Sequence, residues 1–505
     1  MKTALKGTCF FIPVLLLAGL VSLAALGKKD TDVRGRAELR YGFSSEPATL
    51  DPLSSSNTAD GRSILFNVYE GLVKPDSRGV LRPAVAESWS VEEGGRRYRF
   101  VLRKGLRFSN GQALGSADAA FSINTAIEAK FQGFTQIEKV ETPDEAALLV
   151  TLREPDPEFL PYLTIGIVPA DNPDREKNPV GSGPFMIQSY AAQQSLVLVK
   201  NPHYRQADLP KLDRVTIIFL ADSDALFFAL QGGNIDGASV TGSIVEQLDP
   251  ERFDIIPGFS NTVQLLALNN SVKPLDDIRV RQAINYAVGR KAVIDTAFYG
   301  RGEPSGSPLI PGLAQYYDAS LREPYPLDAE RARRLLAEAG YGEGGRKLSL
   351  EITAPSNYSM HVDTAQVIVN QLEAAGITSS IKLTDWASWL SETYRGRKYE
   401  ATIISLDAGN VSPRSFLSRY HSGSGSNFIN YKSDAYDRSY DAAQRESDEG
   451  KRIELYKECQ RIMSRDAASV FIQDIMNFKA FSKGRFGGSL NYPLYVIDFS
   501  TIYRN

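Results

Sequence analysis

The sequence predicts an α/β protein with more than one domain, and three observations support this. First, 505 residues are too many for a single hydrophobic core. Second, an apolar strand-like run at Val215–Leu220 is followed by a helix and by a further strand at Ile235. Third, strands at 348–352 and 377–383 flank a helix that ends at Gly376. Two strands joined through a helix usually pair in parallel, which predicts a buried parallel sheet.

Helix starts are predicted where a side chain that can accept from free helix N–H groups precedes residues of helical spacing. In chain order these positions are Thr58 or Asp60, Ser116, Asp222 or Ser223, the Asp276–Asp277 pair and Asp328. The fourth is the clearest, because apolar residues recur with helical spacing from Val280 to Val288, and Gly300 supplies a stop. Two more helical stretches are predicted over 386–394 and 434–465.

Strands are predicted from apolar runs and from alternation of apolar and polar residues. Besides those named above, they are Leu39–Phe43, Tyr98–Leu102, Ala147–Leu152, Tyr399–Leu406, Val470–Ile475 and Tyr495–Phe499. The second and third belong to a span with an Asn110-Gly111 turn and the helix after Ser116. This span is predicted to form a small α+β unit inserted into a larger domain.

Residues 1–27 are predicted to be a secretory signal. Lys2 and Lys6 precede an apolar run from Phe10 to Leu26, and Ser22-Leu23-Ala24 offers a small-residue cleavage site. An uncleaved membrane anchor stays open, because the run approaches spanning length. In either case we expect the protein in the periplasm or at the outer face of the cytoplasmic membrane.

Composition and charge exclude several classes of protein. The formal net charge is −3 with Lys and Arg spread widely, so nucleic acid is not an expected partner. Cys9 falls in the signal and leaves Cys459 alone, so no internal disulfide is expected and Cys459 is predicted to be a buried thiol. The membrane is expected to matter only through the N-terminal segment or a membrane partner, and the protein is expected to be a monomer.

The sequence offers little for catalysis. The three histidines are isolated, without metal-binding spacing, and no G-x-S-x-G motif occurs. Glu154, Asp156 and Glu158 alternate with prolines, and we predict an exposed loop there rather than a general acid/base pair. Neither 178–190 nor 300–302 is a glycine-rich turn between a strand and a helix, which argues against phosphate loops. We therefore expect no enzyme, no cofactor and no metal site.

Several long segments carry a family resemblance. They are SSEPATLDP (44–52), YEGLVKPDSRGVLRPAVAESWSVEEGGRRYRFVLRKGLRFSNGQAL (69–114), NPVGSGPFMIQSY (178–190), LNNSVKPLDDIRVRQAINYAVGRKAVI (268–294) and YPLDAERARRLLAEAGY (325–341). In these segments, in their order, the chain resembles the large extracytoplasmic solute-binding proteins of ABC importers, family 5, which include oligopeptide-, dipeptide- and nickel-binding proteins.

The resemblance implies a two-lobed periplasmic-binding-protein clamshell, type II in its large three-domain form, with an extra α+β domain. Carried onto this chain, lobe I combines 37–73, 181–264 and 480–505, the extra domain is 74–180, and lobe II is 265–479. The two crossings, near Leu265 and Lys479, are the implied hinge. A ligand that contacts both lobes would stabilise the closed form, which a membrane permease would recognise.

The resemblance also directs attention to the loop after the strand at 399–406. Peptide-binding members carry an aspartate there that pairs with the peptide amino group, four residues before a proline. In SLDAGNVSPRSF (405–416), Pro413 matches the proline and Gly409 takes the place of the aspartate, while Asp407 lies two residues earlier. No Arg occurs between Lys347 and Arg395 to hold a ligand carboxylate. Either the loop has drifted or the class of ligand has changed.

The function expected from the sequence is that of an exported, non-enzymatic component of an ABC importer. It would capture short peptides or peptide-like solutes and deliver them to the permease. The alternatives are a binding protein for a metal chelate, an oligosaccharide or another small polar solute, and, from other classes, a sensor or chaperone or an exported hydrolase. The candidate ligand-binding residues are Ser45, Glu46, Asn57, Trp386, Trp389, Leu406, Asp407, Ala408, Gly409, Asn410, Tyr420 and Asn427.

Overall fold

The computed structural model describes residues 37–54, 56, 58–342, 344–407 and 410–505. Within it Ala37–Asn505 forms one compact unit. The predictions for the signal and for Asn57, Ala408 and Gly409 lie outside the described residues. No helix in the described part of the chain has the length and apolar character needed to cross a membrane.

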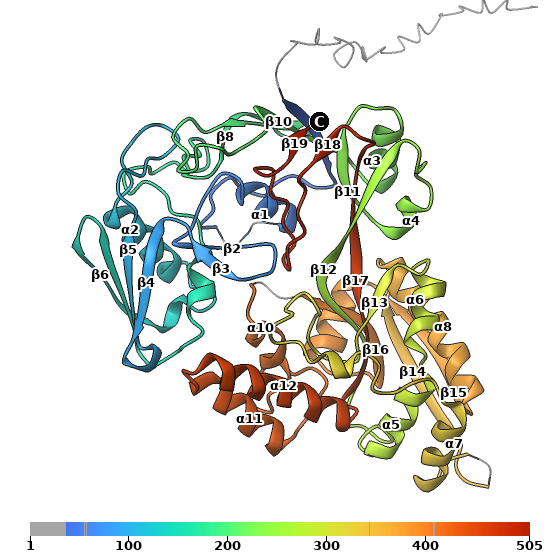
Figure 1. Cartoon of the computed structure of the whole chain (residues 1–505). Helices are drawn as coiled ribbons and strands as arrows, with labels where there is room; N and C mark the ends of the chain where they lie inside the picture. The colour runs from blue at the N-terminus through green and yellow to red at the C-terminus, as the bar shows by residue number, and fades with distance from the viewer. Residues whose placement is uncertain (1–36, 55, 57, 343, 408–409) are drawn as a thin grey trace, which may run out of the picture. The chain divides into compact units, whose positions relative to one another are not determined.

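A mixed sheet of 11 strands runs through this unit (Figure 1). One half contains β1 (Glu38–Phe43), β8 (Phe185–Ala191), β9 (Ser195–Lys200), β10 (Arg214–Phe219) and β11 (Gly237–Val240), and the other contains β14 (Leu348–Pro355), β15 (Ile377–Thr384) and β16 (Ala401–Asp407). The short β13 (Gly302–Pro304) pairs with the long strand β17 (Ser469–Ser482). β1 lies parallel to β10 and β11, and β14 lies parallel to β15 and β16. The predicted parallel pairing is therefore confirmed for β14 and β15, whereas β10 and β11 do not pair with each other but lie parallel on either side of β1. The two halves of the sheet belong to the two lobes.

Two long strands, β12 (Phe253–Leu268) and β17 (Ser469–Ser482), belong to both halves of the sheet. Their antiparallel ladder is regular as far as the Phe259–Met476 pair, breaks, and resumes at Val263–Asp474. Asn261, inside the break, has a left-handed φ of 62°. Such a bulge bends the strands locally. The break lies within the two strands that join the lobes.

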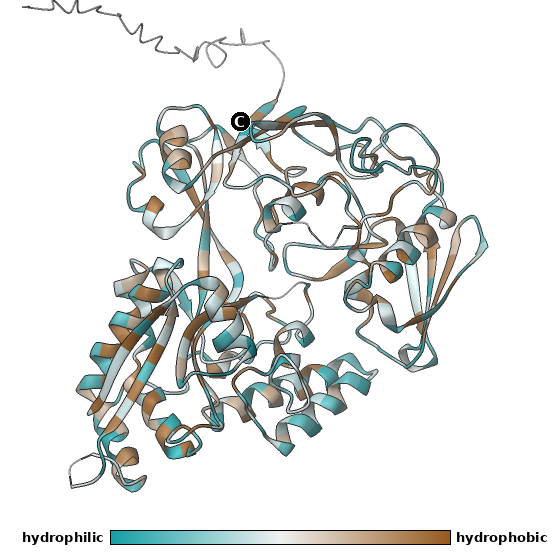
Figure 2. Ribbon diagram, turned by 180° about the vertical axis from the view of Figure 1, so that it is seen from behind, coloured by the Kyte–Doolittle hydropathy of each residue, from teal (hydrophilic) through white to brown (hydrophobic). Residues whose placement is uncertain are grey.

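The second half of the sheet is covered on both faces. One hydrophobic core lies under α5 (Ile278–Ala287), α6 (Arg290–Ala297), α7 (Ala329–Glu338) and α8 (Ser359–Ala374). The other lies under a π-helix (Trp389–Arg395), which follows α9 (Trp386–Ser388), together with α10 (Arg414–Leu417), α11 (Asp434–Arg445) and α12 (Glu449–Arg465). Figure 2 shows hydrophobic residues along the strands and hydrophilic residues on the outer helices. The first half packs against α1 (Ala59–Leu65), α3 (Ser223–Gln231) and α4 (Gly242–Val245).

A separate four-stranded antiparallel sheet has the order β4 (Ala86–Glu92), β5 (Arg97–Leu102), β7 (Ala147–Leu152) and β6 (Ile137–Asp144). α2 (Ser116–Glu128) and the segment 153–167 share its core. We call this sheet, α2 and 153–167 the small-sheet module. A hairpin of β2 (Val73–Pro75) and β3 (Leu81–Pro83) precedes it. The predicted small α+β unit is thus present.

The predicted helix caps are mostly confirmed. Thr58, Asp222, Asp277 and Asp328 each accept a hydrogen bond from the first turn of their helix. The prediction for Ser116 was wrong, since the helix begins at Ser116 and its N-cap is Gly115. The Ser116 hydroxyl donates instead to a backbone carbonyl outside the helix. The single helix expected to end at Gly300 is two helices, separated by Val288 and Gly289.

The strand predicted at Tyr495–Phe499 does not form, although a short strand β19 (Tyr503–Arg504) follows. Side chains of lobe I satisfy the backbone there instead. Asn67 donates from Nδ2 to the Ile497 carbonyl at 2.8 Å and accepts from the Phe499 N–H at 2.8 Å. The Ser63 hydroxyl accepts from the Ile497 N–H at 2.9 Å. The apolar residues of this alternating segment, Ile497 and Phe499, are therefore buried although the segment pairs with no other strand.

Candidate functional site

Polar segments follow the carboxyl ends of parallel strands in both lobes, which is where open α/β sheets bind ligands. In lobe I, β1 leads into Ser44, Ser45 and Glu46. In lobe II, β16 leads into Asp407 and Asn410. The strands β12 and β17 join the two lobes between these segments.

In lobe I a buried carboxylate organises the segment after β1. Asp60 accepts from the Ser45 N–H at 3.0 Å, from the Ser45 hydroxyl at 2.7 Å, and from the Tyr495 hydroxyl at 3.0 Å. Asp60 lies in the first turn of α1, where the helix dipole favours a negative charge. Burial, reinforced by the charge of Asp60, raises the pKa of Tyr495, so this hydroxyl remains a donor. Sequence reasoning missed both Asp60 and Tyr495 as members of this site.

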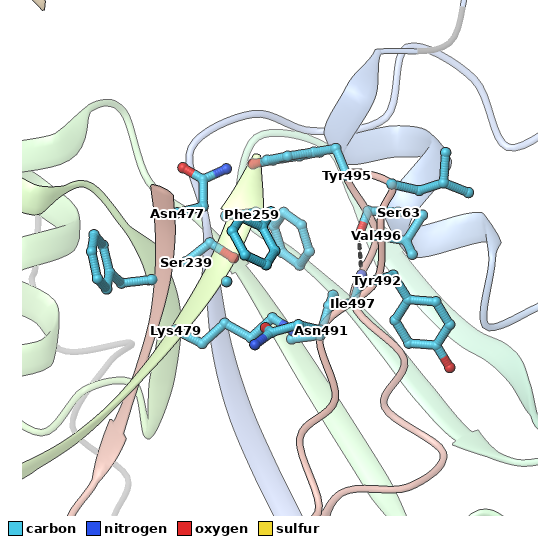
Figure 3. A pocket seen from close by; sticks show the side chains of 14 residues that line it. Ser63, Ser239, Phe259, Asn477, Lys479, Asn491, Tyr492, Tyr495, Val496 and Ile497 are labelled. Carbon is cyan, nitrogen blue, oxygen red and sulfur yellow. Dashed lines mark hydrogen bonds between the residues drawn. The ribbon is translucent and has the colours of Figure 1, made fainter. Parts of the chain in front are cut away.

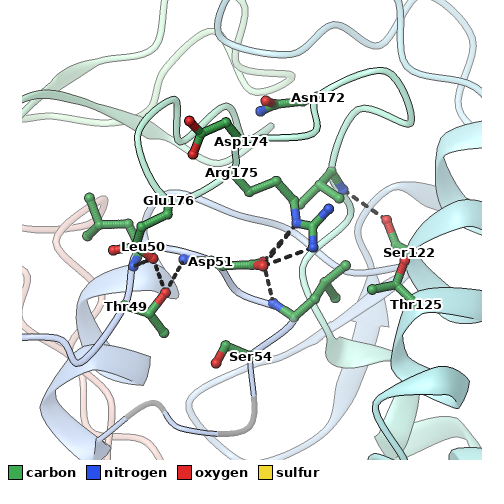
Figure 4. A network of polar contacts seen from close by, with 12 residues as sticks. Thr49, Leu50, Asp51, Ser54, Ser122, Thr125, Asn172, Asp174, Arg175 and Glu176 are labelled. Carbon is green, nitrogen blue, oxygen red and sulfur yellow. Dashed lines mark hydrogen bonds and ion pairs between the residues drawn. The ribbon is translucent and has the colours of Figure 1, made fainter.

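The next part of the same segment is fixed by ion pairs and hydrogen bonds, as Figure 4 shows. Arg175 binds both carboxylate oxygens of Asp51 through Nε, at 3.0 Å each. Glu176 accepts from the Leu50 N–H at 3.0 Å and from the Thr49 hydroxyl. The end of the SSEPATLDP motif therefore holds the loop around 174–176, while its first residues directly follow β1.

Glu46 serves a similar bracing role. Its carboxylate accepts from the Tyr190 hydroxyl at 2.8 Å and from the Gln193 N–H at 2.7 Å. These contacts tie the end of β1 to the turn between β8 and β9. Ser45 remains exposed, whereas Glu46 is half-buried.

In lobe II three aromatic side chains form a cluster after the ends of β14 and β15. Trp386 is 37% exposed and lies parallel to Trp389, with ring centroids 5.1 Å apart. The Tyr358 ring meets Trp386 edge-on at 5.5 Å. Trp389 is buried, and its indole N–H donates to the Thr402 hydroxyl at 3.0 Å. Trp386 is therefore partly exposed to solvent, while Trp389 supports it from the core.

The loop after β16 has an exposed start and an ordered end. The Asp407 side chain is exposed, while its carbonyl accepts from Arg419 at 2.6 Å. The Asn410 side chain accepts from the Ser412 N–H at 3.0 Å and from the Ser415 hydroxyl at 2.6 Å. The loop is thus anchored on both sides of the predicted ligand position.

The other candidate residues of lobe II lie in its core. Leu406 and Tyr420 are buried in the hydrophobic core under α11 and α12. Asn427 is also buried and donates to the Tyr431 carbonyl at 2.8 Å. The structure therefore brings Asp407 and Asn410 together on one loop, places Trp386 on an exposed face, and gives Leu406, Tyr420 and Asn427 structural surroundings.

A small cavity lies where the hinge strands meet the C-terminal segment (Figure 3). It is lined by Phe259 from β12, Asn477 and Lys479 from β17, and Asn491 and Tyr495. Its volume of about 30 Å³ accommodates water but not a peptide-sized solute. Burial lowers the pKa of Lys479 to about 8. The cavity therefore lies between the two strands that connect the halves of the sheet and the C-terminal segment.

Asp474 is a further residue that sequence reasoning missed. It is completely buried at the ladder break, where it accepts from the Ser260 hydroxyl at 3.3 Å and the Thr262 N–H at 3.4 Å. In the described residues its second oxygen has no hydrogen-bond partner, and no ion pair joins it to a cation. Burial therefore raises the pKa of Asp474 to about 8. The signal was available in the sequence as a lone acid inside the apolar run VFIQDIM.

The prediction of an exposed loop at 154–158 was wrong for two of its three acids. Asp156 and Glu158 are buried, and both face Arg414 of lobe II. The burial is possible because an ion pair compensates for the lost hydration of the carboxylates. Only Glu154 is exposed.

Groups that could perform chemistry elsewhere are few. Within the described ranges, no group of three or more His, Cys, Asp or Glu side chains is placed to hold a metal ion. Burial lowers the pKa of His361 to about 4 and raises that of Cys459 to about 12. The prediction that Cys459 is buried is confirmed.

Comparisons with known proteins agree on one family. The model described as "Bacterial extracellular solute-binding proteins, family 5 Middle" matches residues 80–428. The protein named "probable deoxycholate-binding periplasmic protein YgiS" of Escherichia coli is 28% identical over 498 residues, which cover 90% of this chain and 92% of that protein. Heme-binding protein A of Haemophilus influenzae is 27% identical (91% and 90% covered), and di/tripeptide-binding protein 3 of Pseudomonas aeruginosa is 26% identical (88% and 93%).

Solved structures show the same fold. The ABC transporter substrate-binding protein CtaP of Listeria monocytogenes is 24% identical and superposes with a TM-score of 0.82, covering 93% of this chain and 99% of that one. The binding protein AgaA of A. tumefaciens, solved with agropinic acid, is 27% identical with a TM-score of 0.70, covering 93% and 99%. The predicted two-lobed clamshell is confirmed.

Proposed function

Because the chain belongs to the bacterial extracellular solute-binding proteins of family 5, we propose that it is the exported binding component of an ABC importer. It captures short peptides or peptide-like solutes between its lobes and delivers them to a membrane permease. The observation that carries this proposal is the pair β12 and β17, which belongs to both lobes and whose ladder shifts register twice, between Phe259 and Val263 and between Gln264 and Leu265. Such a pair allows the lobes to rotate about a fixed line.

The proposed function also includes a division of the chain into domains. Lobe I comprises 37–73, 181–264 and 480–505, the extra domain 74–180, and lobe II 265–479, while 1–27 direct export or anchor the chain. The cores support this division, since separate hydrophobic clusters lie in the small-sheet module and on the two halves of the large sheet. The break between Phe259 and Val263 lies close to the proposed crossing near Leu265 and supports a hinge there.

The proposed cleft uses polar groups from lobe I and an aromatic face from lobe II. Ser45 and Asp60 lie on one side, and Trp386, Asp407 and Asn410 on the other. A side chain of a peptide can stack on the exposed Trp386 ring, and the exposed Asp407 carboxylate can receive a ligand amine. A site built from stacking and a few polar groups accepts ligands of varied sequence.

A non-peptide solute is the second candidate, and a specific observation favours it. Trp386 and Tyr358 are both more than a third exposed, so an apolar patch lies beside the proposed cleft. In addition, Gly409 offers no acid where the resemblance expects one. A flat apolar ligand gains more from this surface than a free amine does.

One experiment separates the two candidates. Protein without residues 1–27 is examined by native mass spectrometry for retained ligand, and its melting temperature is then measured with dipeptides to pentapeptides, with deoxycholate and with haem. A ligand that binds only the folded state raises the melting temperature. Peptide shifts support the proposal. Shifts with deoxycholate or haem alone, without any co-purified peptide, overturn the peptide assignment but keep the binding function.

Protein without residues 1–27 is also used to test whether it hydrolyses peptides. Peptides that shift the melting temperature are incubated with it and recovered by chromatography. A binding protein returns them intact, whereas hydrolysis at a rate proportional to protein concentration would identify an exported hydrolase.

The loop after β16 is tested by Gly409→Trp. A bulky side chain at this position should abolish ligand binding without changing the melting temperature of the free protein. Gly425→Trp is the matched control, because a Cβ at Gly425 meets nothing within 4 Å. Equal affinities of both variants for the identified ligand would remove this loop from the site.

A further inference from the structure

A buried ion cluster joins the small-sheet module to lobe II. Asp156 and Glu158 of the module are 5% and 6% exposed, and the Arg414 side chain is 16% exposed. Arg414 binds Asp156 with both guanidinium Nη atoms, at 2.7 and 2.6 Å, and its Nε lies 3.6 Å from Glu158. This is the planar, two-point geometry in which arginine recognises a carboxylate most strongly.

The module holds its half of the cluster rigid before Arg414 is considered. The Asp156 carboxylate accepts from the Glu158 N–H and from Gln136 Nε2, at 3.0 Å each. The Tyr98 hydroxyl donates to the Asp156 carbonyl. At Gly95 an added Cβ would lie 2.6 Å from the Pro157 nitrogen, so only glycine fits against this turn. The module therefore presents a preformed acceptor.

Lobe II contributes neutral donors around Arg414. The Tyr456 hydroxyl of α12 donates to Glu158, and the Ser412 hydroxyl donates to it at 3.4 Å. Ser412 in turn accepts from the Arg414 N–H at 3.1 Å. The contact therefore includes the loop before α10 as well as the arginine.

The hairpin before the module packs against the lobe II core. Leu81 contacts both the module core and the lobe II core, to which Val411 belongs, and a Cβ at Gly79 would lie 3.8 Å from Val411. Ser412 and Arg414 are thus contacted by the module, and Val411 lies beside the hairpin. These residues follow the exposed Asp407 and the half-buried Asn410 of the candidate ligand loop.

We propose that the small-sheet module positions the candidate ligand loop through Asp156 and Glu158, with Arg414 as a positioning residue for ligand capture. β16 fixes the start of the loop within lobe II, and the module fixes its end from across the cleft. The cluster is also a second connection between the two sides, away from the hinge pair β12 and β17 (Figure 1). Rotation of lobe II about the hinge must therefore break the cluster, which acts as a latch.

The latch is tested first without ligand, so that this test is independent of the proposed function. Spin labels are placed at Lys104→Cys, just after β5, and at Lys451→Cys on α12, both exposed positions. Distances between them are measured by pulsed electron resonance in protein without residues 1–27. The native Cys459 is buried and does not compete for label. If the latch is intact, the distances between the two spin labels should fall in a narrow range.

Arg414→Gln is expected to broaden this distribution and move it to longer distances. Arg279→Gln is the matched control, because Arg279 pairs with Asp277 inside lobe II at 2.6 Å and joins no two domains. A combined Asp156→Asn, Glu158→Gln, Arg414→Gln variant removes all three charges of the cluster together, so that neither Arg414 nor a carboxylate of the cluster is left without its partner. An unchanged distribution in this folded triple variant would overturn the proposal.

A binding measurement then tests the positioning role, which rests on the proposed function. Trialanine, or the solute found by mass spectrometry, is titrated by calorimetry. We expect at least a tenfold loss of affinity in the triple variant and none in Arg279→Gln, with Arg414→Lys between them because the charge remains but the two-point contact is lost. Equal affinities of the triple variant and the wild type would overturn the positioning role. If the wild type binds no peptide, the proposed ligand fails, while the spin-label result still decides the latch.

Discussion

Replacing Asp474 by Asn should stabilise the protein, and the gain should grow with pH. The carboxyl is completely buried at the hinge break, and no ion pair joins it to a cation in the described part of the chain. It titrates near 3.8 in the unfolded chain but at about 8 in the folded protein. Between these two values the folded state keeps a proton that the unfolded state has lost.

The magnitude follows from proton linkage. Across that window the free energy of unfolding falls by about 1.4 kcal/mol per pH unit as pH rises. At pH 7 the accumulated loss is about 4 kcal/mol, because about three pH units separate pH 7 from the unfolded pKa. Asn cannot ionise and escapes this loss, although its amide leaves one N–H unpaired at a cost of about 1–3 kcal/mol. Asp474→Asn should therefore gain about 1–3 kcal/mol at pH 7.

The assay is urea unfolding of both proteins from pH 4 to 9. The difference between them should grow between pH 4 and 8 and be constant above. Asp498 is the internal control. Burial alone would raise its pKa, but the charge of Lys74 and hydrogen bonds from Ser500 and Tyr492 hold its pKa below the usual value. Asp498→Asn should thus lose stability at neutral pH, and the loss should shrink as pH falls through the folded pKa.

A pH-independent difference for Asp474→Asn would refute the reasoning, because it would mean that the carboxyl has the same protonation in the folded and unfolded states. A difference that shrinks as pH rises would require a hidden cationic partner.

Three further tests address other parts of the structure. Arg290 is fully buried and donates only to neutral acceptors. Arg290→Met should therefore destabilise the protein by about 3 kcal/mol or more, because it leaves carbonyls unpaired. The control Lys291→Met, at an exposed position, should change the stability in urea by less than about 0.5 kcal/mol. Trp389→Ala should cost about 3–5 kcal/mol, while the exposed Trp386→Ala should leave stability nearly unchanged and weaken ligand binding at least tenfold by calorimetry. Cys459, whose pKa burial raises to about 12, should react with a thiol reagent only after urea unfolding; equal rates in the folded and unfolded protein would contradict its burial.

The parts of the fold that sequence reasoning predicted well depend on neighbours in the chain. Caps such as Asp277 and Asp328 act on N–H groups two or three residues away, so the local pattern contains all the information needed. The same holds for the parallel strands, which are joined by a single helix.

The predictions for Asp156 and for the segment at Ile497 failed because these residues contact partners far away in the sequence. Asp156 was predicted to be exposed because its neighbours are prolines, but its burial depends on Arg414, 258 residues later. Likewise, nothing local indicates that the backbone at Ile497 is satisfied by side chains of lobe I. The candidate site is a product of such distant contacts, which is why only its strand ends, and not its bracing residues, could be predicted.

The contact between Asn67 and the C-terminal segment has a consequence for biosynthesis. Two of the hydrogen bonds of this buried amide reach residues 430 and 432 positions later in the chain. Until those residues have been synthesised, the amide has no such partners and lobe I lacks part of its core. A nascent chain thus remains incompletely folded while it leaves the ribosome. Such a delay is compatible with the export proposed above, in which the chain would cross the membrane before it folds.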